Sequence, residues 1–135
     1  MEKKVSCGLK ITFLVHFIVG VVFGLIFLLI PVVWGNLIGW TINEPWIYRL
    51  LGAALLGFVT SSWFGYRETA WEKVKIVIRM EIVWTILGTI VMILGIISAG
   101  LPKIGWINAG ILAAFAVAFC IFYSPKEEEQ KGKEA

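Results

Sequence analysis

Long stretches without a charged side chain dominate the sequence, and short segments rich in charge separate them. Asp, Glu, Lys and Arg are absent from residues 11–43, 50–66, 82–102 and 104–125. A helix needs about 20 residues, within a range of roughly 17–25, to cross the hydrocarbon core of a bilayer. Three of the stretches match one crossing each, whereas the first is too long for one crossing and too short for two. We interpret it as one helix followed by an ordered connection at the membrane surface.

Proline, glycine and capping residues predict where the helices begin and end. Pro31 removes a backbone donor and disfavours helix in the residue before it, so the first helix should end there. Gly100 and Pro102 should end the third helix, and Thr69 with Glu72 forms a capping-box pattern at its start. We therefore expect helices at about residues 9–30, 45–66, 70–99 and 103–123, which predicts an all-α, antiparallel four-helix membrane bundle in residues 1–124.

The connection over residues 31–48 contains three regularly spaced tryptophans among apolar residues. Tryptophan prefers the headgroup level of a membrane, where its ring is apolar and its N–H stays hydrated. We expect this connection to form a short helix or turn in the outer interface. The tryptophans recur every six residues, at Trp34, Trp40 and Trp46.

Composition and charge support this picture and predict an orientation. The chain is 59% hydrophobic and 16% charged, against about 45–50% and 25% in soluble domains. With four crossings, only Arg49 and Lys103 lie on one side of the membrane. The remaining cationic residues lie on the other side: Lys3, Lys4, Lys10, Arg67, Lys73, Lys75, Arg79, Lys126, Lys131 and Lys133. The positive-inside rule then predicts a plasma-membrane protein with both termini in the cytoplasm.

The last residues differ in composition from the rest of the chain. Residues 125–135 are strongly charged and contain no large apolar side chain. Such a segment cannot bury enough apolar surface to offset the entropy of ordering. We therefore predict a disordered, charged cytoplasmic tail.

Small residues at four-residue spacing predict how the helices pack. Residues four apart stack on one face of a helix, and small side chains there let two helices approach closely in lipid. The central strip runs along the second helix from Arg49. The predicted packing positions are Gly20, Gly24, Ala53, Gly57, Ser61, Gly65, Gly88, Gly110 and Ala114.

A few polar residues at membrane depth are candidates for function. Ionisable residues there are functional candidates by default, although a structural role in fixing helix register is the alternative for each of them. Glu81 should point into the bundle, where His16, Arg67, Ser61 or Ser62 are possible partners, and Arg79 can extend toward the headgroups. The candidate ligand, proton or structural cluster is therefore His16, Arg67, Arg79 and Glu81. Arg49, at the outer end of its strip, is a candidate for binding a lipid phosphate or for pairing with Glu44.

The sequence contains no motif for a catalytic or metal centre. There is no phosphate-binding loop, no nucleophile with a base, and no haem or dinucleotide motif. The acidic residues and the two cysteines have no metal-ligand spacing. The basic residues are interleaved with glutamates, which disfavours nucleic acid as a partner. We expect no enzyme activity, no metal and no cofactor, with a quinone as the alternative. A four-helix drug exporter matches the size, but a glutamate in the first helix is typical of those proteins, and His16 takes that place here.

One set of residues resembles a known family. It spans roughly residues 31–88 and is similar to small, largely archaeal four-helix membrane proteins, and more distantly to DoxX-like four-helix proteins. Some DoxX-like proteins are subunits of quinone-linked oxidoreductases, so the resemblance implies the fold and a possible quinone. The residues that carry it are Pro31, Trp34, Gly35, Gly39, Trp40, Pro45, Arg49, Leu50, Leu51, Gly52, Ala53, Ala54, Gly57, Tyr66, Arg67, Trp71, Arg79, Met80, Glu81 and Trp84.

These observations favour three functions in order. The first is a structural or accessory protein, either a subunit of a membrane complex or a homo-oligomer, because the small-residue strips exceed the needs of one bundle. The second is a subunit that binds a quinone or lipid between the first three helices, with its polar head near His16 and Glu81. The third is a small transporter, which ranks last because no helix carries a charge at its middle.

Overall fold

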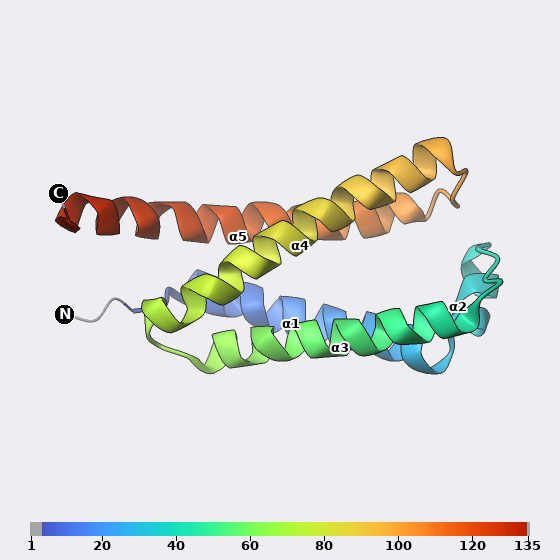
Figure 1. The fold of residues 1–135 in the computed structure, drawn as a ribbon, viewed down its shortest axis with the longest axis horizontal. Coiled ribbons are helices and arrows are strands. Elements are labelled where there is room, and N and C mark those ends of the chain that lie inside the picture. The colour runs from blue at the N-terminus through green and yellow to red at the C-terminus, as the bar shows by residue number, and fades with distance from the viewer. Residues whose placement is uncertain (1–3, 135) are drawn as a thin grey trace.

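Four long helices and one short helix follow from the pattern of apolar runs and breaking residues. The computed structural model describes the backbone of residues 4–134 and the side chains of residues 4–123. The elements in this part of the chain are α1 (Cys7–Leu29), α2 (Pro31–Ile38), α3 (Pro45–Arg67), α4 (Trp71–Ser98) and α5 (Gly105–Glu134) (Figure 1). Four segments are long and apolar enough to cross a membrane: Cys7–Leu29, Pro45–Arg67, Trp71–Ser98 and Gly105–Tyr123. The prediction of an all-helical chain is confirmed, and the four long apolar helices suggest a multi-pass membrane protein.

Local chemistry explains most of the helix ends. The Ser6 hydroxyl accepts the backbone N–H of Leu9 at 3.3 Å and caps α1. The α1 helix ends just before Pro31, which is the first residue of α2. Gly39 ends α2 with φ of 72°, a left-handed conformation that glycine adopts without steric cost. The connection thus contains a short helix, as predicted.

The predicted capping box of Thr69 and Glu72 is wrong, because Ala70 is the N-cap residue of α4 and no side chain caps the helix. In the turn just before α4, the Glu68 carboxylate accepts the backbone N–H groups of Thr69 at 2.8 Å and Ala70 at 3.1 Å. These two bonds, the Thr69 bond first, lower the pKa of Glu68 below its ordinary value of 4.5 because they stabilise the ionised form. The carboxylate also pairs with Lys73, at 3.4 Å.

The last helix extends further than the sequence predicts. The expected span ended near residue 123, whereas α5 continues to Glu134. The side chains after Tyr123 lie outside the described residues, so the disordered tail at residues 125–135 stays a prediction.

The long helices form two pairs. The α1 helix packs along α3, and α4 packs along α5, while contacts between the pairs are far fewer. Figure 1 shows the pairs together at the end where the N-terminus lies and apart at the end occupied by α2 and the α4–α5 connection. The bundle is therefore a pair of helical hairpins joined at one end, rather than four helices packed evenly along their length.

The joined end contains the main apolar core. Leu9 and Phe13 of α1 pack with Trp71 and Ile78 of α4 and with Phe119 of α5, and all five are fully buried. The extended segment before α1 closes this end further. There the backbone N–H of Val5 donates to the carbonyl of Thr69 at 2.8 Å, and Lys4 forms an isolated bridge with Ala70.

Glycines allow α1 and α3 to approach within backbone contact. A Cβ atom on Gly52 would lie 2.5 Å from the Leu28 nitrogen and 2.7 Å from the Gly24 carbonyl oxygen. A Cβ on Gly24 would lie 2.9 Å from the Leu56 side chain, and one on Gly20 would clash with Val59. This spacing leaves no room for side chains at the contact, which is the packing that small residues permit in lipid.

The predicted packing strip is only partly correct. Gly20, Gly24, Gly65 and Gly88 do lie at helix contacts; a Cβ on Gly65 would meet the Phe13 ring at 2.8 Å, and one on Gly88 would meet Leu112 at 3.2 Å. The strip on α3 is wrong at Ala53 and Gly57, which face outward, and Ser61 is half-buried. Gly110 and Ala114 of α5 also face outward. No atom of the described residues lies within 4 Å of a Cβ built on Gly57 or Gly110.

Helix geometry explains the error. Each residue turns an α-helix by about 100°, so each step of four residues rotates the face by about 40°. Gly52 and Gly57 consequently lie about 140° apart around α3. The face that meets α1 contains Gly52 and Val59, and Ala53 and Gly57 point away from it.

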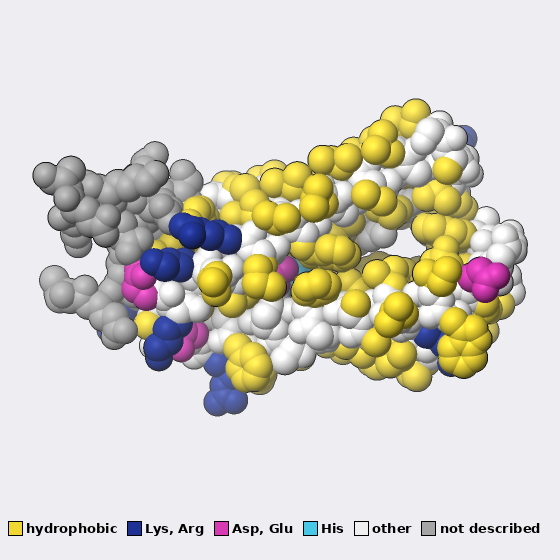
Figure 2. All heavy atoms as spheres, viewed as in Figure 1, with side chains coloured by type: hydrophobic (Ala, Val, Ile, Leu, Met, Phe, Trp, Pro, Cys, Tyr) yellow, Lys and Arg dark blue, Asp and Glu magenta, His cyan; other side chains and the backbone are white. Residues whose placement is uncertain are grey.

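Charge is distributed unevenly along the long axis. Lys and Arg side chains gather at the joined end, and far fewer occur at the open end (Figure 2). The surface between the two ends is largely apolar, with exposed side chains that include Ile11 of α1, Leu50 of α3 and Val91 of α4. This distribution is that of a protein whose middle zone faces hydrocarbon.

Candidate functional site

Three buried polar side chains from three helices form a hydrogen-bonded chain near the middle of the molecule. His16 of α1, Ser62 of α3 and Glu81 of α4 have 5%, 0% and 3% of their surface exposed. Ser62 Oγ lies 2.9 Å from His16 Nδ1 and donates to Glu81 Oε1 at 2.7 Å. His16 Nδ1 and Glu81 Oε1 are 3.6 Å apart. Ser62 therefore bridges the two ionisable groups.

His16 also contacts the fourth long helix. Its ring meets Phe115 of α5 edge-on, with ring centroids 4.7 Å apart, and Phe119 at 5.6 Å. The sequence leads to this arrangement because His16 follows Leu9 and Phe13 on the buried face of α1. All four long helices thus converge on His16, at the level where the two hairpins begin to separate.

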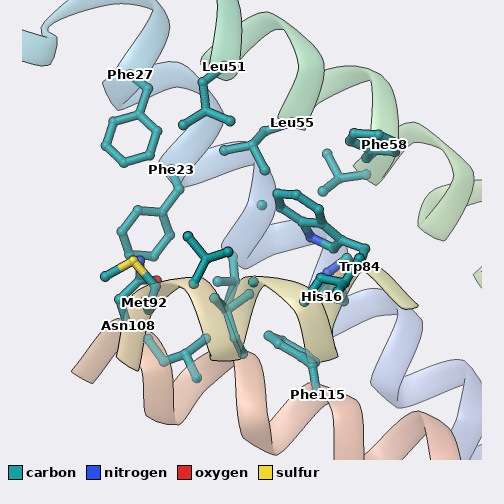
Figure 3. Close-up of a pocket in the computed structure, with 18 residues that line it drawn as sticks. His16, Phe23, Phe27, Leu51, Leu55, Phe58, Trp84, Met92, Asn108 and Phe115 are labelled. Carbon is teal, nitrogen blue, oxygen red and sulfur yellow. The ribbon is translucent and has the colours of Figure 1, made fainter. Parts of the chain in front are cut away.

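A cavity extends from His16 toward the open end, between the hairpins. Its volume is about 390 Å³, and Figure 3 shows its lining side chains projecting inward from both hairpins. Among the lining residues only His16, Asn108 and Trp84 carry polar side-chain atoms. His16 and Asn108 lie on opposite sides of the cavity. The lining residues are His16, Val19, Gly20, Phe23, Phe27, Leu51, Leu55, Phe58, Val59, Trp84, Leu87, Gly88, Val91, Met92, Asn108, Ile111, Leu112 and Phe115.

One wall of the cavity is shared with a groove on the outer surface. Phe58 of α3 and Trp84 of α4 stack with ring centroids 5.5 Å apart and an interplanar angle of 18°. These two residues and Leu87 line both the cavity and the groove, which also includes Met80 and Val83. Met80, Val83 and Leu87 are exposed. The stacked rings and Leu87 therefore lie between the cavity and the lipid-facing groove.

The structure brings together part of the predicted polar cluster. His16 and Glu81 meet through Ser62, which the sequence singled out as one possible partner of Glu81. Arg79 and Arg67 are both exposed and lie outside this buried chain, contrary to the prediction. Helix geometry explains this: Arg79 is two residues from Glu81 and points to a different face of α4.

Aromatic residues bind these two arginines. Arg79 Nε donates to the Tyr123 hydroxyl at 2.5 Å, and its guanidinium lies 5.5 Å from that ring centroid. The Arg67 guanidinium lies 5.9 Å from the Trp63 ring centroid. Both contacts are of the cation–π type.

Arg49 contacts an aromatic ring at the open end. Its guanidinium lies 5.0 Å from the centroid of Trp46. Its Nε atom is buried and has no hydrogen-bond partner among the described residues. A lipid phosphate as the ligand of Arg49 stays a prediction.

Sequence reasoning missed Asn108 and the cavity. Asn108 is the only amide in the apolar run of α5, a signal that was available from the sequence. The cavity has no sequence signal, because its lining is made of the same Leu, Val, Ile and Phe residues that fill cores. It arises from the divergence of two hairpins, which depends on contacts between distant residues.

The remaining chemistry and the comparisons with known proteins add no further site. Within residues 4–123, no three His, Cys, Asp or Glu side chains gather in a way that suits a metal ion. Cys7 and Cys120 are free and exposed. No known protein family, curated protein or solved structure matches the chain, so the resemblance to DoxX-like proteins stays an expectation from the sequence.

Proposed function

We propose that this chain is a membrane protein that binds a lipophilic molecule, of the quinone or lipid class, in the cavity between its two hairpins. The observation that carries the proposal is an apolar cavity of about 390 Å³ with the buried histidine His16 in its wall. Protein interiors are packed nearly as densely as organic crystals, and their voids rarely exceed the size of a water molecule. Ligand pockets, by contrast, range over roughly 300–1,000 Å³ and combine apolar walls with a few polar groups.

The wall formed by Phe58 and Trp84 supports a ligand that comes from the bilayer. A molecule dissolved in lipid can occupy the outer groove and pass into the cavity by displacing two side chains. Side-chain rotation is much faster than helix rearrangement. This route needs no opening to water, which suits an apolar ligand.

The test is whether filling the cavity removes co-purifying lipophiles. Leu55 lines the cavity, whereas Leu50, on the same helix, is 72% exposed and does not line it. Leu55→Trp fills part of the cavity, and Leu50→Trp is the matched control. After mild detergent extraction, mass spectrometry of bound small molecules should show a species on the wild type and on Leu50→Trp that is depleted from Leu55→Trp. The same set of bound molecules on all three proteins would refute the proposal.

A second candidate function is self-association or assembly with another membrane subunit. Ala53 and Gly57 of α3 and Gly110 and Ala114 of α5 face outward, where their small side chains leave room for another helix. Cross-linking in native membranes tests this candidate. It predicts a cross-linked species larger than the monomer that is lost in Gly57→Leu, and recovery of monomer alone would contradict it.

We also propose that both termini face the cytoplasm, across the plasma membrane. The concentration of Lys and Arg at the joined end supports this orientation. Cys7 is exposed near that end. In a Cys120→Ser background, a membrane-impermeant maleimide should label Cys7 in inverted vesicles and leave it unlabelled in intact cells. Labelling of Cys7 in intact cells would contradict this orientation.

A further inference from the structure

We infer that the cavity selects an uncharged ligand with a hydroxyl group, an alcohol or phenol, which donates a hydrogen bond to His16 Nε2. This inference rests on the proposed binding function and specifies the chemistry of the ligand. The reduced form of a quinone and a lipid alcohol both belong to this class. An ether or ketone of the same shape does not.

The bridging position of Ser62 determines which nitrogen of His16 carries hydrogen. A serine hydroxyl has one hydrogen to donate and lone pairs with which to accept. With the Glu81 carboxylate ionised, its oxygens can only accept, so Ser62 donates its hydrogen to Oε1 at 2.7 Å and offers a lone pair to His16 Nδ1 at 2.9 Å. His16 Nδ1 must then carry the hydrogen. A neutral imidazole has one N–H, and Nε2 is left with a lone pair that accepts.

The Ser61 hydroxyl also lies near Glu81 Oε1, at 3.4 Å, but its hydrogen is donated to the Phe58 carbonyl oxygen at 2.5 Å. Ser62, at 2.7 Å, is therefore the hydroxyl that donates to Glu81. The hydrogen-bonded chain therefore runs from His16 through Ser62 to Glu81, and it acts on the ligand through the opposite edge of the imidazole ring.

His16 Nε2 is the atom of the hydrogen-bonded chain to which a ligand in the cavity can donate a hydrogen bond. Among residues 4–123, hydrogen bonding to His16 occurs through Nδ1, and His16 is part of the cavity wall. Phe115 and Phe119 contact the ring but offer no conventional hydrogen-bond donor. A hydroxyl in the cavity supplies the missing donor, which an ether lacks.

The rest of the lining requires an uncharged ligand. No Asp, Glu, Lys or Arg lines the cavity. Transfer of an ion from water into such surroundings is strongly unfavourable without a partner of opposite charge. Asn108, across the cavity from His16, supplies one amide for a second neutral polar group.

The inference can be tested with two probes that differ only in whether the phenolic oxygen carries a hydrogen atom or a methyl group. Para-nonylphenol donates a hydrogen bond, and its methyl ether, para-nonylanisole, does not. We would measure saturable binding of each by titration calorimetry to the protein in lipid nanodiscs, with empty nanodiscs subtracted. Leaving a buried acceptor without its donor costs roughly 1–3 kcal/mol, so the wild type should bind the phenol about 5-fold to 150-fold more tightly than the ether.

Two variants separate the role of the chain behind His16 from general effects of substitution. Ser62→Ala is combined with Glu81→Ala, because Glu81 Oε1 lies 3.6 Å from Nδ1 and would otherwise hold the hydrogen there. In this double variant His16 can place its hydrogen on either nitrogen, and the phenol-to-ether preference should fall toward one while the ether still binds. Ser98→Ala is the matched control, because Ser98 is exposed and its hydroxyl donates to the Leu94 carbonyl on its own helix. It should keep the preference of the wild type.

The outcomes separate this inference from the function on which it rests. Equal or tighter binding of the ether to the wild type would refute the hydroxyl selection but leave ligand binding intact. An unchanged preference in the folded double variant would also refute it, since Ser62 and Glu81 would not determine which nitrogen carries the hydrogen. Absence of saturable binding for both probes would refute the binding function itself. If the double variant does not fold, the wild-type preference alone decides.

Discussion

The backbone contact between α1 and α3 predicts that two glycine substitutions five residues apart have opposite effects on stability. Gly52→Ala places a methyl group 2.5 Å from the Leu28 nitrogen and 2.7 Å from the Gly24 carbonyl oxygen. Both atoms belong to the backbone of α1 and cannot move without moving the helix. Gly57→Ala places the same methyl group where no described atom lies within 4 Å.

The two variants differ by the cost of overpacking alone. Alanine is better than glycine in a helix interior by about 1 kcal/mol, and both variants share this gain. Overpacking a well-filled contact costs about 1–3 kcal/mol. We therefore expect Gly57→Ala to be at least as stable as the wild type, and Gly52→Ala to be less stable than Gly57→Ala by about 1–3 kcal/mol.

Unfolding in mixed micelles with increasing SDS measures this difference. Helical circular dichroism and tryptophan fluorescence would follow the loss of tertiary structure at equilibrium. Gly52→Ala should unfold at a lower mole fraction of SDS than Gly57→Ala. Equal stabilities, or a less stable Gly57→Ala, would refute the close approach of α1 and α3 at Gly52.

Three further predictions follow from buried groups and from the Glu68 carboxylate. Phe13→Ala should cost about 3–5 kcal/mol, because Phe13 is fully buried against Phe119; Phe64→Ala is the control, since Phe64 is 64% exposed, and an equal loss in both would contradict the assignment of the core. Glu81→Ala should destabilise by about 1–3 kcal/mol by removing the acceptor of the buried Ser62 hydroxyl, whereas Glu81→Gln keeps an acceptor oxygen and should cost less in the same SDS titration. The lowered pKa of Glu68 means that its ionised form stabilises the folded state, so this contribution is present above the ordinary value of 4.5 and is lost as the pH falls through the lowered pKa. The difference in melting temperature between the wild type and Glu68→Ala should therefore shrink on acidification below that value, and a difference that grows would contradict this role of the Glu68 carboxylate.

Sequence reasoning recovers the helices well because lipid imposes a strong and local signal. Four uncharged runs, together with helix-breaking residues at Pro31, Gly100 and Pro102, suffice to locate four spans. The buried face of each helix is harder to predict, because both faces of a membrane helix are apolar. The small-residue strip on α3 illustrates this, since its four-residue spacing rotates around the helix and meets α1 at Gly65 but not at Gly57.

The polar site can be predicted from the sequence only in part. Sequence reasoning selects His16 and Glu81 because ionisable groups at membrane depth are costly. It includes Arg79 and Arg67 incorrectly, since a list of charged residues does not distinguish a buried group from one at the membrane surface. The central role of Ser62 depends on distances among three helices, which no local pattern contains.

Because the two hairpins are joined at one end only, that end is a hinge between them. Phe13, Trp71 and Phe119 pack together at that end, whereas α3 and α4 contact each other at only a few positions. A wider ligand then requires only a small rotation of one hairpin relative to the other about the joined end. The packing inside each hairpin stays unchanged. The spacing of the two hairpins at the open end, which depends on the lateral pressure of the surrounding bilayer, then determines the size of ligand that the cavity binds.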